Sequence, residues 1–318
     1  MPCSPQTPSQ TTSLPNPRRW TWRGFSVVYQ AMEPDGIAVG PEHPSSAVVL
    51  IHGFGASWGH WRQNISALAQ ANRVYAIDLI GFGGSDKPAP EQLPYTFETW
   101  GQQVADFCRE VVGESAFLVG NSIGCIVALQ TAVSAPDLVR GVAMLNCSLR
   151  LLHDKRRSTL PWHRRVGAPI LQRLLGIQWL GYGFFKLLAR RGTVKNVLTQ
   201  AYASPERVTD ELVEMLLQPS RDPGAADVFL AFTRYSSGPL PEELLAALED
   251  SDIPILILWG VDDPWEPVAM GRTLAQFSCV EDFIPLENAG HCPQDEVPEQ
   301  VNAILNRWLR SQALAAEA

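Results

Sequence analysis

One short stretch, residues 117–128, constrains the fold of this 318-residue chain more than any other. It begins as an apolar run typical of a buried strand and continues with a pattern typical of a helix. Between the two lies Gly-x-Ser-x-Gly, with Ser122 flanked by Gly120 and Gly124. A serine on so tight a turn has a strained backbone, and side chains two residues away would collide with it. The pattern also fits a glycine-rich strand end without chemistry, so the rest of the chain must decide.

Continuous apolar runs recur along the chain and alternate with helical patterns. The runs at 46–52, 74–78, 142–147 and 253–259 are typical of strands buried on both faces. A final helical pattern places apolar side chains on one face across residues 301–309. This alternation predicts an α/β fold with a mostly parallel, doubly wound sheet.

The alternation is interrupted by residues 149–251, which are helical in pattern and contain no clear strand. We interpret this segment as a helical cap, or lid, inserted into a core formed by residues 19–148 and 252–318. Residues 1–18 are polar and rich in proline, which predicts a disordered tail without a secretory signal.

An acid and a base suited to activating the serine follow the predicted strands after the cap. Asp262 and Asp263 come just past the strand at 253–259, and His291 follows the next strand. Such groups converge at the carboxyl ends of strands in open α/β sheets. Serine hydrolysis needs a histidine that accepts the hydroxyl proton and a carboxylate that orients it. The order serine, acid, histidine therefore predicts Ser122 as nucleophile and His291 as base.

The choice between the two aspartates depends on spacing alone. Asp263 has the Gly-x-x-Asp spacing that is usual for the acid of such enzymes, so we predict that it orients the histidine. Asp262 stays open as the alternative, with Asp263 then capping the following turn.

Main-chain groups complete the predicted site. The N–H groups of Phe54, after the first parallel strand, and of Ile123, after the nucleophile, are predicted to form the oxyanion hole. We interpret His52 as a structural group that positions the Phe54 loop, and Asp78 and Asp86 as groups that brace loops.

With these residues in order, residues 20–310 resemble the α/β-hydrolase superfamily. Within it, the runs at 50–57, 75–88 and 120–124 are similar to those of the chlorophyll dephytylases, and the run at 289–299 is similar to that of the pheophytinases. The resemblance implies hydrolysis of the phytyl ester of chlorophyll or pheophytin, with Ser122, His291 and Asp263 as the triad. The cap is less similar, so the resemblance implies the chemistry more strongly than the substrate.

Composition limits the other classes of function. A net charge of −8 argues against general nucleic-acid binding. The six cysteines form no close pair, which indicates reduced thiols and a cytosol-like compartment. No histidine spacing is typical of a metal site, and we expect neither a metal nor a cofactor.

The predicted cap differs from the rest of the chain in charge. Between Arg150 and Lys195 there are eleven basic residues and one acidic residue, Asp154, in an otherwise acidic chain. Apolar residues lie between the charges. This composition suits peripheral association with an anionic membrane, or a channel for an isoprenoid tail. It equally suits a cap that packs on the core with solvated arginines.

We therefore expect a serine carboxylic-ester hydrolase, without metal or cofactor, that acts on a hydrophobic ester of the chlorophyll type. The alternatives are an esterase, peptidase or C–C hydrolase for a smaller substrate, and a non-catalytic binding protein of the same fold. Epoxide hydrolases and haloalkane dehalogenases place an aspartate where Ser122 stands and are disfavoured. The expected location is cytoplasmic, with peripheral association with a photosynthetic (thylakoid) membrane as its extension.

Overall fold

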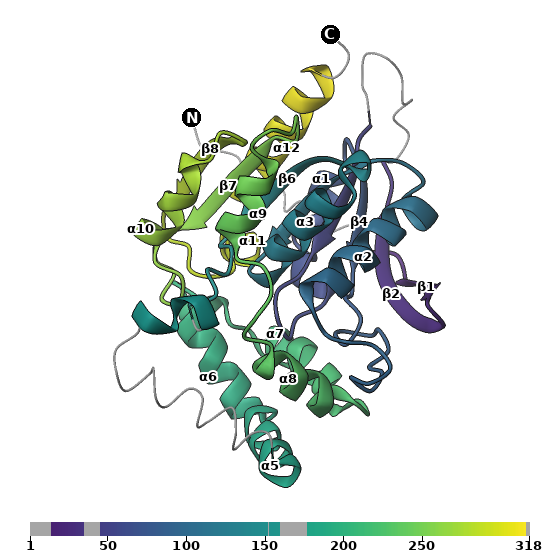
Figure 1. Ribbon diagram of the computed structural model, residues 1–318, viewed down its shortest axis with the longest axis vertical. Coiled ribbons are helices and arrows are strands. Elements are labelled where there is room, and N and C mark those ends of the chain that lie inside the picture. The colour runs from purple at the N-terminus through teal and green to yellow at the C-terminus, as the bar shows by residue number, and fades with distance from the viewer. Residues whose placement is uncertain (1–13, 35–44, 152, 160–176, 316–318) are drawn as a thin grey trace, which may run out of the picture.

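An eight-stranded sheet forms the centre of the computed structural model, which describes residues 14–34, 45–151, 153–159 and 177–315 (Figure 1). The strands lie in the order β1-β2-β4-β3-β5-β6-β7-β8. Only the pairings of β1 with β2 and of β2 with β4 are antiparallel, and the others are parallel. The strands are β1 Arg18–Trp22, β2 Phe25–Met32, β3 Ala47–Ile51, β4 Arg73–Ile77, β5 Ala116–Asn121, β6 Val139–Leu145, β7 Ile255–Gly260 and β8 Val280–Leu286.

Side chains of the central strands serve two separate apolar cores, one on each face of the sheet. In β3, Val49 and Ile51 belong to one core, and Val48 and Leu50 belong to the other. All four are fully buried, because successive residues of a strand point to opposite faces and both faces are covered. This is the reason that the strand appears in the sequence as a continuous apolar run.

Helices cover the two faces. Helices α2, α3 and α9 supply apolar side chains to one core, and α1 and α12 supply them to the other. Figure 1 shows α2 and α3 side by side over the sheet. Their bounds are α1 Ile65–Leu68, α2 Phe97–Phe107, α3 Ile123–Ser134, α9 Pro241–Leu248, α10 Val268–Gly271, α11 Pro293–Glu296 and α12 Pro298–Ala315.

The described residues between β6 and β7 form helices and no strand. Helix α9 lies beside α3 over the sheet, whereas the other helices gather beyond one end of the sheet, with α5 at the far tip of the molecule (Figure 1). Besides α9 they are α5 Gln178–Leu188, α6 Arg191–Ala201, α7 Asp210–Leu217 and α8 Ala225–Arg234, with short 3-10 turns.

The predicted fold class is confirmed, since a mostly parallel sheet lies between helices on both faces. Most of the predicted tail, residues 1–13, lies outside the described residues. The described chain begins at Leu14, and the carbonyl of Pro15 accepts a hydrogen bond from Gln30. Among the described residues, no helix combines the length and the apolar character needed to span a bilayer. The five described cysteines are buried, and none of them is in a disulfide.

Candidate active site

The turn between β5 and α3 holds Ser122 in a backbone conformation that side chains rarely adopt. Its φ is 56° and its ψ is −119°. A Cβ atom on Gly120 would lie 2.4 Å from the backbone of Gly124, and one on Gly124 would lie 2.4 Å from the carbonyl oxygen of Ile51. Backbone passes through both places, so neither position tolerates a side chain. Gly120 and Gly124 therefore leave free the space that the tight turn at Ser122 requires, as predicted.

A histidine and an aspartate meet beside this turn. His291 Nδ1 lies 2.8 Å from Asp263 Oδ2, and both side chains are buried. Asn121, the residue before the serine, donates from Nδ2 to the carbonyl of His291 at 3.1 Å. Asp262 is exposed, and its N–H donates to the carbonyl of Ala289. Of the two aspartates, the structure therefore places Asp263 against the histidine.

Hydrogen bonds hold the carboxylate of Asp263 in its charged form. Oδ2 accepts from Asn146 at 2.7 Å, and Oδ1 accepts from the N–H groups of Trp265 and Glu266. Burial would raise the pKa of this carboxyl, but its hydrogen bonds, led by that with His291, hold the pKa below its ordinary value. A carboxylate can only accept, so Nδ1 donates to it and Nε2 is left to act as a base.

The loop after β3 passes directly against the serine. A Cβ atom on Gly53 would lie 3.2 Å from Cβ of Ser122, so the chain approaches the turn closely at this point. Phe54 follows at once. Within the described residues, the N–H groups of Phe54 and Ile123 donate to no other protein group. They are available to a negatively charged oxygen bound near Ser122. Ser122 Oγ and His291 form no hydrogen bond in the described structure, and such contacts are often long without substrate.

A serine at a strained strand-to-helix turn, followed in the chain by an aspartate–histidine pair, is the arrangement that the sequence predicted. Comparison with known protein families matches residues 48–304 to the alpha/beta hydrolase family. The chain belongs to this family.

Relatives of this α/β hydrolase have different reactions in their names. Pheophytinase from Arabidopsis thaliana, a chloroplastic protein, is 27% identical over 295 residues. That match covers 83% of this chain and 61% of pheophytinase, so the chain spans less than two thirds of that relative. A 2-hydroxymuconate semialdehyde hydrolase from Pseudomonas sp. is 27% identical, with 86% of this chain and 91% of the relative covered. An esterase from Thermogutta terrifontis has the same fold, with a TM-score of 0.70, 22% identity, and 94% and 99% of the two chains covered.

His52 fastens the Phe54 loop of this α/β hydrolase to the segment that follows β4. The ring is fully buried, with Nδ1 2.7 Å from the carbonyl oxygen of Gly53 and Nε2 accepting the N–H of Leu79 at 3.0 Å. Burial lowers the pKa of His52 to about 4. These contacts agree with a structural histidine that positions the loop. Asp78 likewise accepts the N–H groups of Trp58 and Gly84, and Asp86 accepts the N–H group of Ser26 in β2.

The buried neutral His52 predicts a dependence of stability on pH. Below about pH 6.5 an unfolded histidine takes up a proton, whereas the folded one does so only near pH 4. Lowering the pH from 6.5 to 4 therefore favours the unfolded state. The stability advantage of the native protein over His52→Gln should shrink by about 3 kcal/mol across this range. Urea unfolding of both proteins at several pH values measures it. A constant difference would contradict the assignment.

Two residues near the acid were missed by the sequence analysis. Asn146 follows β6 and bonds both to Asp263 and, through Oδ1, to the N–H of Gly260. Its place after a parallel strand was a signal that could have identified it. Glu266 is buried, with Oε1 3.3 Å from Ser148 Oγ, and burial raises its pKa to about 7. Nothing in the local sequence marks Glu266 as a second carboxyl beside His291.

The loop that carries His291 is also fastened to the end of helix α6. The N–H of His291 donates to the carbonyl of Ala201 at 2.8 Å. The buried carboxyl of Glu296 accepts from Gly290 and Cys292 of this loop at 3.0 and 3.1 Å, and from Ala203 after α6 at 2.7 Å. One carboxyl group therefore joins the histidine loop to the segment that follows α6.

A second contact joins the same segments nearby. The hydroxyl of Tyr202 donates to Oδ2 of Asp295 at 2.8 Å and lies 3.0 Å from Nε2 of His60. All three side chains are buried. The histidine loop and the end of α6 are thus held together at several points.

Replacing Glu296 by glutamine is expected to weaken this connection. An amide has one accepting oxygen, so at least one buried N–H group would face an NH₂ group instead. We expect the free energy of unfolding to fall by about 1–3 kcal/mol. If His291 is the base, kcat should fall about 10- to 100-fold through its misplacement. Denaturant unfolding and ester hydrolysis measure the two effects. Glu299→Gln, an exposed change on α12, is the matched control. Equal behaviour of the two variants would contradict the role of Glu296.

Proposed function

We propose that this α/β hydrolase is a serine carboxylic-ester hydrolase, with Ser122 as nucleophile, His291 as base and Asp263 as the group that orients the base. The observation that carries the proposal is the hydrogen bond from His291 Nδ1 to Asp263 Oδ2 beside the Ser122 turn. With Nδ1 bonded to the carboxylate, Nε2 of the histidine is free to accept the proton of Ser122.

The reaction follows from these positions. Ser122 Oγ attacks the ester carbonyl while His291 Nε2 accepts its proton. The N–H groups of Phe54 and Ile123 stabilise the negative charge on the carbonyl oxygen. Asp263 stabilises the imidazolium, which gives its proton to the departing alcohol. A water molecule, activated by the same histidine, then hydrolyses the acyl-enzyme and restores Ser122.

An apolar cavity beside the oxyanion loop supports a hydrophobic substrate. It has a volume of about 80 Å³, and the side chains that line it are mostly apolar. They include Phe54, Phe82, Phe185, Leu216, Val228 and Phe229. An apolar chain bound there removes its surface and that of the lining from water. A cavity of this size accepts only a short part of a long apolar chain, so the choice of the phytyl ester of chlorophyll or pheophytin as substrate rests on the similarity to pheophytinase.

The experiment is to incubate the purified protein with chlorophyll a and with pheophytin a in mild detergent, beside a short-chain nitrophenyl ester. Ser122→Ala is the control in each assay. We expect the dephytylated pigment and phytol to appear with the native protein only. Turnover of the short ester alone would support the serine esterase and overturn the pigment.

Two other functions are distinguished by further measurements. The similarity to 2-hydroxymuconate semialdehyde hydrolase favours, as the second candidate, a C–C hydrolase for a smaller substrate. Cleavage of a ring-fission product without ester turnover would assign that reaction. A fluorophosphonate probe tests for a binding protein, since failure to label Ser122 would argue against any serine hydrolase.

A further inference from the structure

Helix α5 presents apolar side chains to solvent along one stripe. Its exposed positions, Trp179, Gly183, Lys186 and Leu187, recur at the spacing of one helical face, and Arg190 continues the stripe beyond the helix. Trp179 is 74% exposed and Leu187 is 51% exposed. Trp179 is the most exposed of the large apolar side chains in the described chain. An exposed apolar stripe of this kind is typical of a surface that meets a partner.

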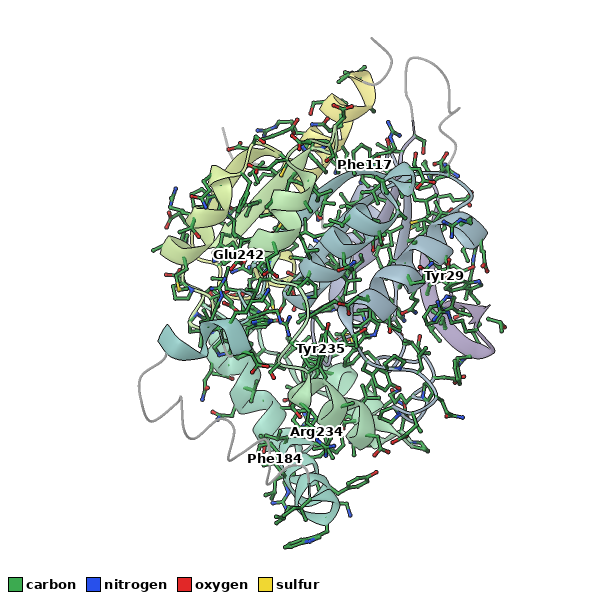
Figure 2. All side chains as sticks on the ribbon, in the orientation of Figure 1. Tyr29, Phe117, Phe184, Arg234, Tyr235 and Glu242 are labelled. Carbon is green, nitrogen blue, oxygen red and sulfur yellow. The ribbon has the colours of Figure 1, made fainter. Side chains whose placement is uncertain are left out.

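Contacts on the other face fix the orientation of this helix. Phe184 (Figure 2) and Phe185 pack against Phe229 of α8, with ring centroids 6.3 and 5.4 Å apart. The hydroxyl of Tyr182 donates to Asp227 of α8. Since these aromatic side chains face the protein, the stripe with Trp179 must face outward. The helix also lies at the tip of the molecule, away from the sheet (Figure 1).

The charge on this helix is of one sign. Helix α5 contains no acidic residue, and the exposed Lys186 and Arg190 lie toward its C-terminal end. The basic residues of α6, Arg191 and Lys195, are different because they form ion pairs with Asp210. Tryptophan and leucine beside exposed cations fit the interface of an anionic lipid bilayer.

We propose that the exposed stripe of α5 binds the surface of an anionic lipid membrane. The helix lies flat in the interface, with Trp179 and Leu187 among the acyl chains and Lys186 and Arg190 at the headgroups. Phe185, on the protein side of the same helix, lines the apolar cavity beside Phe54. The helix therefore separates the membrane surface from that cavity. Under the proposed function, an ester that leaves the membrane beside α5 would enter this cavity first.

Vesicle flotation tests the membrane surface without any turnover. Native protein is mixed with vesicles of phosphatidylcholine and phosphatidylglycerol, or of phosphatidylcholine alone, at low and high ionic strength. We expect binding to the anionic vesicles that weakens as salt is added. Two double variants test the surface. The first replaces Trp179 and Leu187 by serine, and the second replaces Lys186 and Arg190 by glutamine. Each should reduce binding by about tenfold or more. Met270→Ser with Leu314→Ser is the matched control, since it removes two exposed apolar side chains elsewhere.

Each outcome decides the proposal. Failure to float with anionic vesicles, or equal flotation of all variants, would overturn it. Sedimentation without lipid tests the alternative. A dimer that is lost when Trp179 is replaced would assign the stripe to a second copy of the chain. Hydrolysis of a soluble short ester should be the same in all these variants. If the native protein does not hydrolyse the short ester, only the proposed function is contradicted, because flotation requires no chemistry.

Discussion

Replacing Ser122 by alanine is expected to lower kcat for ester hydrolysis by about 10⁴- to 10⁶-fold. Alanine keeps the Cβ atom and removes only the hydroxyl, so the backbone at φ 56° is no more strained than before. The free energy of unfolding should stay within about 0.5 kcal/mol of the native value. The loss therefore reports on chemistry and not on folding. Burst kinetics and steady-state turnover of a nitrophenyl ester measure it.

Ser134→Ala provides the control for this change. Ser134 is the last residue of α3, the helix that begins directly after Ser122, and its side chain is exposed. Its turnover should equal that of the native protein. If Ser122→Ala keeps more than about one hundredth of the native rate, the serine is not the nucleophile.

Replacing Asp263 by asparagine is expected to lower kcat by about 10⁴-fold. An asparagine that turns its NH₂ group to His291 Nδ1 would stabilise the tautomer protonated on Nε2. That nitrogen could then no longer accept the proton of Ser122. The same NH₂ group would also face the side-chain NH₂ group of Asn146, which in the native protein donates to Oδ2 of Asp263. Measuring kcat together with the unfolding transition separates the tautomer effect from a loss of stability.

The neighbouring residue supplies a matched comparison. Asp262→Asn makes the same chemical change one position earlier, on an exposed side chain. We expect its kcat to stay within about twofold of the native value. The opposite ranking of the two variants would assign the acid to Asp262 and contradict the hydrogen bond seen at His291.

The central fold was predictable because its signals are local. Two glycines around Ser122 identified the turn, and runs such as 46–52 identified strands covered on both faces. Helix α2 ends at Phe107 and continues as a π-helical turn to Val112. Helix boundaries of this kind depend on packing and carry little signal in the sequence.

Features that depend on distant residues were not predictable. The sequence offered two adjacent aspartates, and only the directions of their side chains separate them. The bond from Ala203 to Glu296 joins residues 93 positions apart, with no pattern that pairs them. The composition of the cap left open whether its apolar residues pack inward or face out. In α5 both occur, because α8 takes one face and leaves the other exposed.

The fastening of His291 to Ala201 restricts how this protein can diversify. A segment between β6 and β7 transplanted from a relative would bring a different end of α6 to the loop that holds His291. The graft would have to keep the carbonyl of residue 201 and the N–H of residue 203 in their present positions. Otherwise the loop that carries His291 would lose the hydrogen bonds that position it. New substrate ranges should therefore be more accessible through substitutions within α5 and α8 than through exchange of the whole segment between β6 and β7.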